Sequence, residues 1–202
     1  MHITVTGRHL DVGASLRRRV EQGLDAAVAK YFDRAIEAHV TFDKRGQFFI
    51  ADIAAHVGRG IVAHSSREAD DPYRAFSGAV DHLAKRLRRH KRWLRDHHNA
   101  EARATKVEQA WHYVLAGPGD EEDEAKSGDG AERVDGVPLV VAEMEAEIST
   151  LSVGEAVMRL DLGDAPALMF RNAAGGGFNM IYRRADGHIG WVDPSARKGT
   201  RG

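Results

Sequence analysis

The chain has 202 residues, enough for one domain or two small ones, and a formal net charge of -1. It contains no cysteine, which excludes disulfides and thiolate chemistry. No apolar run approaches the roughly 20 residues needed to cross a bilayer, and residues 1–6 lack the apolar core of a signal peptide. We therefore expect a soluble, cytoplasmic protein with no membrane partner.

The charged residues are distributed unevenly along the chain. Residues 1–99 contain 18 Lys/Arg and 12 Asp/Glu, a balance of +6. Residues 100–136 contain 4 against 10, a balance of -6, and residues 137–202 contain 7 against 8, a balance of -1. This separation predicts a basic domain, an acidic linker and a roughly neutral domain.

The first domain is predicted to span residues 1–98. Its early elements, judged by hydrophobic periodicity, are a strand over residues 2–6, a helix over 14–32, and strands over 35–43, 47–57 and 61–66. Asp71-Pro72 then opens a long helix that runs to about His98, because proline is favourable in the first turn of a helix. The order β-α-β-β-β-α predicts a two-layer α+β domain, in which a four-stranded sheet carries both helices on one face.

The pattern weakens from Asn99 onward. Residues 104–115 are compatible with a short amphipathic helix. The acidic run Asp120–Glu124 and the Gly/Asp-rich stretch to Gly136 are typical of disorder. Residues 99–136 are therefore predicted to form an acidic, flexible linker.

A small α/β domain is predicted over residues 137–194. An extended segment over residues 137–147 precedes Ser152 and Glu155, which have the spacing of a capping box and open a helix that Gly163 can close. The remaining predictions are strands over residues 167–171, 178–184 and 188–192, and a disordered tail over 195–202.

The long helix carries a basic face roughly opposite a predicted apolar stripe, which consists of Tyr73, Phe76, Val80, Leu83, Leu87 and Leu94. Like charges four residues apart, such as Lys85/Arg89 and Arg88/Arg92, destabilise an isolated helix by about 0.2–0.5 kcal/mol each. A polyanion would neutralise this repulsion and release its own counterions. The pattern therefore favours phosphate binding over the alternative of a merely solvated charged face.

Lys and Arg position a protein on a phosphate backbone without reading base sequence. The helix residues that we predict to bind RNA are Arg74, Lys85, Arg86, Arg88, Arg89, Lys91 and Arg92. The residues that could extend this surface are Arg8 after the first strand, Lys44 and Arg45 in the first hairpin, and Arg67 after the fourth strand.

Two stretches of the chain resemble the long form of the ribosome hibernation promoting factors. In the first, Thr6-Gly7-Arg8-His9 follows the first strand and Asp71-Pro72-Tyr73-Arg74-Ala75-Phe76 opens the basic helix. The motifs of the second are Phe170-Arg171-Asn172, Gly177, Asn179, Tyr182-Arg183-Arg184, Asp186-Gly187 and Gly190. Together the two stretches cover about residues 1–98 and 137–194.

The resemblance implies that the first domain sits in the decoding channel of the small ribosomal subunit, over the mRNA and tRNA sites, and blocks translation. It implies that the second domain forms a homodimer that pairs two ribosomes into an inactive 100S particle. The rRNA contacts that it implies are Arg8, Lys85, Arg86, Arg88, Arg89, Lys91 and Arg92.

Self-association is also expected on physical grounds. A domain of about 60 residues is marginal as a monomer. Residues 167–170 are apolar without alternation, which is typical of a strand covered on both faces. The residues that we place in the core or at a dimer interface are Leu168, Phe170, Phe178, Met180 and Tyr182.

No motif indicates catalysis. The 11 histidines have no carboxylate or cysteine partners at ligand spacing, and neither a calcium-binding loop nor a nucleotide-binding fingerprint is present. We expect a non-enzymatic protein with no cofactor, metal or small-molecule substrate. Two alternatives stay open: a regulator that binds structured RNA in general, and a regulator whose basic helix meets an acidic protein.

Overall fold

The computed structural model describes residues 1–32, 37–58, 61–96, 106–117 and 139–195. These residues form two compact units. One combines the described parts of 1–104 and 151–202, and the other lies within 105–150. No helix in the described ranges has the length and apolarity needed to cross a membrane.

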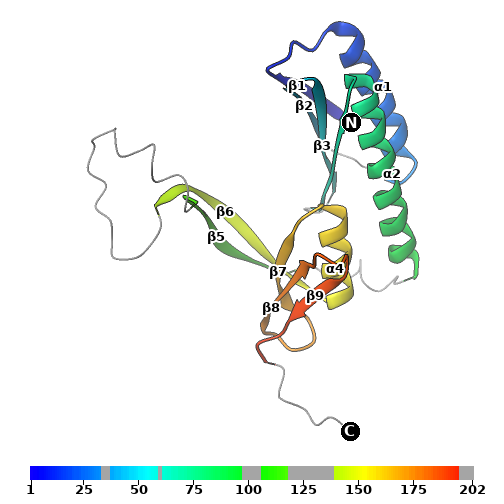
Figure 1. Ribbon diagram of the computed structural model, residues 1–202. Coiled ribbons are helices and arrows are strands. Elements are labelled where there is room, and N and C mark those ends of the chain that lie inside the picture. The colour runs from blue at the N-terminus through cyan, green and yellow to red at the C-terminus, as the bar shows by residue number, and fades with distance from the viewer. Residues whose placement is uncertain (33–36, 59–60, 97–105, 118–138, 196–202) are drawn as a thin grey trace. The chain divides into compact units, whose positions relative to one another are not determined.

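The N-terminal part of the first unit is a two-layer α+β domain, as predicted. Its elements are β1 (His2–Arg8), α1 (Ala14–Ala29), β2 (Glu37–Arg45), β3 (Phe48–Gly58), β4 (Ile61–Ala69) and α2 (Pro72–Asp96). The sheet order is β1-β2-β3-β4, with β1 parallel to β2 and the other two pairings antiparallel. Both helices lie side by side on one face of this sheet (Figure 1).

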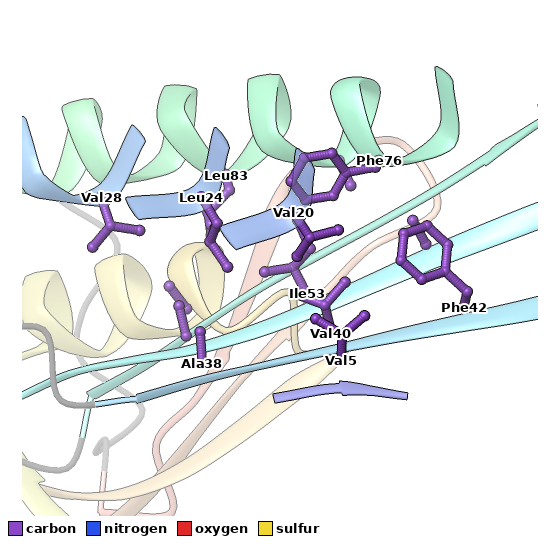
Figure 2. Packing of buried hydrophobic residues seen from close by; sticks show 14 of the residues in the cluster. Val5, Val20, Leu24, Val28, Ala38, Val40, Phe42, Ile53, Phe76 and Leu83 are labelled. Carbon is purple, nitrogen blue, oxygen red and sulfur yellow. The ribbon is translucent and has the colours of Figure 1, made fainter. Parts of the chain in front are cut away.

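The core of this domain lies between the helices and the sheet. Helix α1 buries Leu16, Val20, Leu24 and Val28, four residues apart, so that one stripe of the helix faces the strands. Figure 2 shows Val20, Leu24 and Val28 of this stripe above sheet residues such as Val40. Burying an aliphatic side chain of this size contributes about 1.5–3 kcal/mol.

Helix α2 presents one apolar stripe to the same core. Phe76, Leu83 and Leu87 are buried, as their spacing predicts, whereas Tyr73 of the predicted stripe is 42% exposed. Asp71 caps the helix, because its Oδ1 accepts the backbone N–H groups of Tyr73 and Arg74 at 2.9 and 3.0 Å. Because this stripe faces the core, the side chains on the opposite face of α2 point away from the sheet.

The C-terminal part of the first unit is small. Its elements are α4 (Val153–Leu162), β7 (Ala167–Asn172), β8 (Phe178–Arg183) and β9 (Ile189–Val192), the strands pairing in sequence as an antiparallel sheet. The capping box is confirmed: Ser152 Oγ accepts from Glu155 N, and Glu155 Oε2 accepts from Ser152 N. Gly163 is the C-cap, as expected. Gly187 has φ +84° in the turn before β9, a conformation that favours glycine.

The second unit contains an antiparallel pair of strands, β5 (Val107–Leu115) and β6 (Val140–Leu151), apart from Leu151, which belongs to the first unit. Strand β6 covers residues 140–147 of the extended segment predicted over residues 137–147, and residues 137 and 138 lie outside the described residues. The short helix predicted near residues 104–115 is wrong. The apolar and aromatic residues of this segment are compatible with a helix or a strand. The segment forms a strand because it pairs with β6, and sequence periodicity does not reveal such a long-range pairing. Residues 99–105 and 118–136 of the predicted linker and residues 196–202 of the predicted tail lie outside the described residues.

Candidate nucleic-acid interface

The centre of the basic face is a row of three cations, Lys85, Arg88 and Arg92, which we call the central row. Their spacing of three and four residues places them on one side of α2, away from the buried Leu83 and Leu87. All three are exposed, and within the described ranges none of their side chains has a recorded hydrogen bond or ion pair. The row therefore offers three cations to an anionic partner.

Lys91 lies on the flank of α2 nearest α1. Its Nζ donates a hydrogen bond to the backbone carbonyl of Lys30 at the end of α1, at 3.2 Å. Cations next to a helix C-terminus are favoured there by the helix dipole. Lys91 is exposed but already has a partner in its own chain.

Arg86 and Arg89 lie on the opposite flank of α2. They pair with two carboxylates near the C-terminal end of α4, Asp161 and Asp164. Arg86 Nη2 is 2.5 Å from Asp164 Oδ1, and Arg89 donates from Nε and Nη2 to Asp161 at 2.7–3.1 Å. Sequence analysis missed Asp161 and Asp164, because a contact across more than 70 residues leaves no local pattern.

The other predicted cations stand apart from the central row. Arg8, Lys44 and Arg45 lie where β1 and β2 end, and Arg74 is in the first turn of α2. Eighteen residues separate Arg74 from Arg92, about 27 Å of helix. The sequence-predicted set therefore does not form one compact patch.

Three of these outlying cations have partners. Arg45 Nε donates to Asp43 at 3.1 Å, and Arg74 Nη1 donates to Asp70 at 3.1 Å. Lys44 Nζ lies 5.7 Å from the centre of the Phe49 ring, a cation–π arrangement. These pairings reduce the charge that each residue offers to phosphate.

Asp43 lies opposite Arg8 at the end of β1 and β2 and accepts hydrogen bonds from two neighbouring side chains. It accepts from His9 and Arg45, and these hydrogen bonds, that from His9 first, lower the pKa of the Asp43 carboxyl from 3.8. His9 has φ +56°, in the left-handed region that non-glycine residues rarely adopt. The cluster fixes the path of the chain after β1.

Histidines near α2 are poor sources of positive charge. Burial, with Arg67, Arg86 and Lys85 nearby, lowers the pKa of His82, and burial lowers the pKa of His64. Across the described ranges no cluster of three or more His, Cys, Asp or Glu residues is arranged to hold a metal ion. The positive potential of this surface therefore comes from Lys and Arg.

The C-terminal motif residues build a small polar framework. Asn172 and Asn179 are buried and hydrogen-bonded to each other at 2.9 Å, and Trp191 Nε1 donates to Asn179 at 2.9 Å. A Cβ on Gly190 would lie 2.3 Å from the Tyr182 ring, so only glycine admits that ring at this position. These motifs therefore have structural roles in this chain.

The five residues predicted for the core or a dimer interface differ in burial on the sheet of β7, β8 and β9. Phe170 is fully buried, and Leu168 packs against the same cluster. Phe178 and Met180 are 37% and 40% exposed. Tyr182 is half-buried. The large apolar residues exposed on these three strands are Met169, Phe178, Met180, Trp191 and Val192.

Two regions of the chain match models of a known protein family. Residues 3–95 match the family described as sigma 54 modulation protein / S30EA ribosomal protein, and residues 135–190 match the C-terminal domain of the same family. The chain belongs to this family, and its resemblance to the ribosome hibernation promoting factors is confirmed.

Relatives match the chain over most of its length. It is 38% identical over 193 residues to the ribosome hibernation promotion factor of Rhizobium meliloti, covering 96% of this chain and 97% of that protein. It is 39% identical over 204 residues to the protein of the same name from Bradyrhizobium diazoefficiens, covering 98% and 97%. The ribosome hibernation promoting factor of Salmonella typhimurium is 33% identical over 97 residues, 48% of this chain and all of that protein.

Among solved structures, the chain is similar to the N-terminal domain of Thermus thermophilus Protein Y. The match has a TM-score of 0.40 and 30% identity and covers 44% of this chain and 98% of that one.

Proposed function

We propose that this chain is a ribosome hibernation factor that binds the small ribosomal subunit in the decoding and tRNA region. The observation that carries the proposal is the central row, Lys85, Arg88 and Arg92, exposed on one side of α2. Such a row suits the phosphate backbone of rRNA, where each contact releases counterions. The names of the relatives that match nearly the whole chain support the ribosome as the target.

Inhibition in this proposal is steric. A domain lodged in the decoding region excludes mRNA and tRNA, so no catalysis and no cofactor is required. The site of action is the cytoplasm, where ribosomes translate.

The second part of the proposal is that the C-terminal sheet forms a homodimer that pairs two ribosomes into an inactive 100S particle. Its exposed residues Met169, Met180 and Val192 make an apolar surface on a very small domain. Covering such a surface with a second copy would stabilise both copies. Pairing would then add to the inhibition that the first domain produces.

Sucrose-gradient sedimentation of ribosomes with added protein tests the proposal. Wild-type protein should co-migrate with small subunits and produce dimeric ribosomes. Arg88→Glu/Arg92→Glu should lose co-migration. The matched control, Arg18→Glu/Arg19→Glu, makes the same charge change at exposed positions of α1 and should bind as wild type does.

Equal binding by both double variants would contradict the assignment of the central row. Binding of wild type to any duplex RNA, without preference for ribosomes, would replace the proposal with a general structured-RNA regulator. Binding to an acidic protein but to neither RNA nor ribosomes would favour the protein-interaction alternative.

A further inference from the structure

Helix α4 lies along α2 in the opposite direction. At its start, a Cβ on Gly154 would lie 3.9 Å from the indole of Trp93. At its end, Asp161 pairs with Arg89 and Asp164 with Arg86. The contact therefore follows α2 backward from Trp93 to Arg86, over about two turns of helix.

Leu162 anchors this contact. Its side chain is 1% exposed and belongs to the hydrophobic cluster of the N-terminal domain, with Leu83 and Leu87 of α2. Gly163, which follows it, lies close to β4: a Cβ there would be in van der Waals contact with the Val62 carbonyl oxygen at 3.8 Å. The end of α4 thus completes the core of another domain and holds two carboxylates over the basic helix.

The two carboxylates are held in place by their own domain. Arg183 of β8 donates to the backbone carbonyls of Leu160 and Ala165 and lies 3.8 Å from both Asp161 and Asp164. Asp164 has φ +52°, a conformation that aspartate tolerates better than most residues. The acidic pair is therefore oriented before it meets α2.

This contact occupies cations that RNA would need. The Arg86 side chain is 11% exposed, and its two terminal nitrogens bond to the His64 carbonyl at 2.6 Å and to Asp164 at 2.5 Å. Arg89 directs both Nε and Nη2 at Asp161. A phosphate strand on the central row would also approach both carboxylates, and like charges repel.

We propose that α4 is an intramolecular competitor of RNA: docked, its carboxylates pair with Arg86 and Arg89, and RNA binding across the full basic face requires it to leave. This inference rests on the proposed function, because RNA is the competing ligand. Undocking exposes two further cations to phosphate. The logarithm of the RNA affinity of an undocked variant should therefore fall more steeply with the logarithm of salt, by up to about 1.8 in slope for two added contacts.

Binding of full-length variants to purified small ribosomal subunits tests the competition. Asp161→Asn/Asp164→Asn removes both ion pairs and should bind roughly three- to tenfold more tightly than wild type. The control Glu143→Gln/Glu145→Gln removes the same charge from exposed positions of β6 and should change affinity less. Leu162→Ala weakens the anchor without changing charge and should also tighten binding.

A distance measurement tests docking without RNA. The chain has no cysteine, so spin labels can be attached at Ser77→Cys on α2 and Ala185→Cys after β8, both exposed positions. Wild type should give one narrow distance distribution. Asp161→Asn/Asp164→Asn, Leu162→Ala and an excess of small subunits should each broaden it. Circular dichroism would confirm that each variant remains folded.

The outcomes separate the two proposals. A broad distribution in wild type, or equal affinity gains in the asparagine pair and the glutamine control, would overturn the inference. So would a narrow distance that arises only between different chains in a mixture of singly labelled proteins. Absence of binding to subunits by wild type and all variants would overturn the proposed function, and the distances would still report whether α4 docks.

Discussion

The two domains of this chain use their apolar residues in different ways. In the N-terminal domain, two helices and four strands enclose a core that includes Phe42, Phe76, Leu83 and Leu87. The core of the C-terminal domain is a cluster of five buried residues, Leu151, Ala156, Leu160, Phe170 and Ile181. The first domain can therefore leave the basic face of α2 to solvent, whereas the small sheet of the second leaves an apolar surface, including Met169, Met180 and Val192, exposed.

This difference bears on function. The larger core of the N-terminal domain allows α2 to carry like charges that repel each other, because tertiary packing, not helix propensity, holds the helix. A domain with a small core gains stability from contacts outside itself. Leu162, which packs in the core of the N-terminal domain, is one such contact. A second copy on the exposed sheet face would be another.

The largest effect is expected in the N-terminal core. Phe42→Ala should lower the free energy of unfolding by about 3–5 kcal/mol, because Phe42 is fully buried and its removal leaves a cavity. Denaturant unfolding followed by circular dichroism measures this. Phe48→Ala, on the neighbouring strand but 40% exposed, is the matched control and should cost far less. Equal losses would contradict a core enclosed by this sheet.

The next effect concerns the exposed sheet face of the C-terminal domain. Met180→Lys places a charge at a side chain that is 40% exposed, and it should raise the dissociation constant of the proposed homodimer at least about tenfold, or about 1.4 kcal/mol. Sedimentation over a range of protein concentrations measures this. Phe48→Lys, equally exposed in the N-terminal domain, should leave association unchanged. If both or neither variant dissociates the protein, the assigned face is wrong.

Sequence periodicity was sufficient where one element faces one core. The spacing of Phe76, Leu83 and Leu87 predicted the buried stripe of α2, and with it the direction of the basic face. Local motifs were also sufficient: Ser152 and Glu155 predicted the start of α4. These features are encoded within a few residues of each other.

Contacts between distant segments were not predictable in the same way. The strand at Val107–Leu115 depends on pairing with β6, and the ion pairs of Arg86 and Arg89 depend on residues more than 70 positions away. A single sequence, without an alignment to its relatives, contains no signal for either the strand pairing or the ion pairs. The candidate site was therefore predicted as a set of cations, while its division into free and occupied members required the structure.

A smaller effect is expected from the cap of α4. Ser152→Ala removes the acceptor of the Glu155 backbone N–H and should cost about 1 kcal/mol of unfolding free energy. Because α4 has only 10 residues and a small core beneath it, the loss should appear mainly as faster hydrogen exchange in that helix. Ser77→Ala, at an exposed position of α2, should remain within about 0.5 kcal/mol of wild type. A cap variant that exchanges like wild type would show that packing alone fixes α4.

The smallest effect should come from Asp43, and its sign follows from the pKa shift. Hydrogen bonds from His9 and Arg45 lower the pKa of this carboxyl in the folded protein below 3.8, so the unfolded chain takes up a proton first as pH falls. The stabilisation is therefore fully present above the unfolded pKa and is lost as the pH falls through the folded pKa.

Thermal unfolding of wild type and Asp43→Asn should differ near neutral pH and converge below about pH 4. Asp52→Asn, the same substitution at an exposed position of β3, is the matched control. If the difference between wild type and Asp43→Asn grew as the pH fell, the His9–Asp43–Arg45 cluster would not be stabilising this end of the sheet.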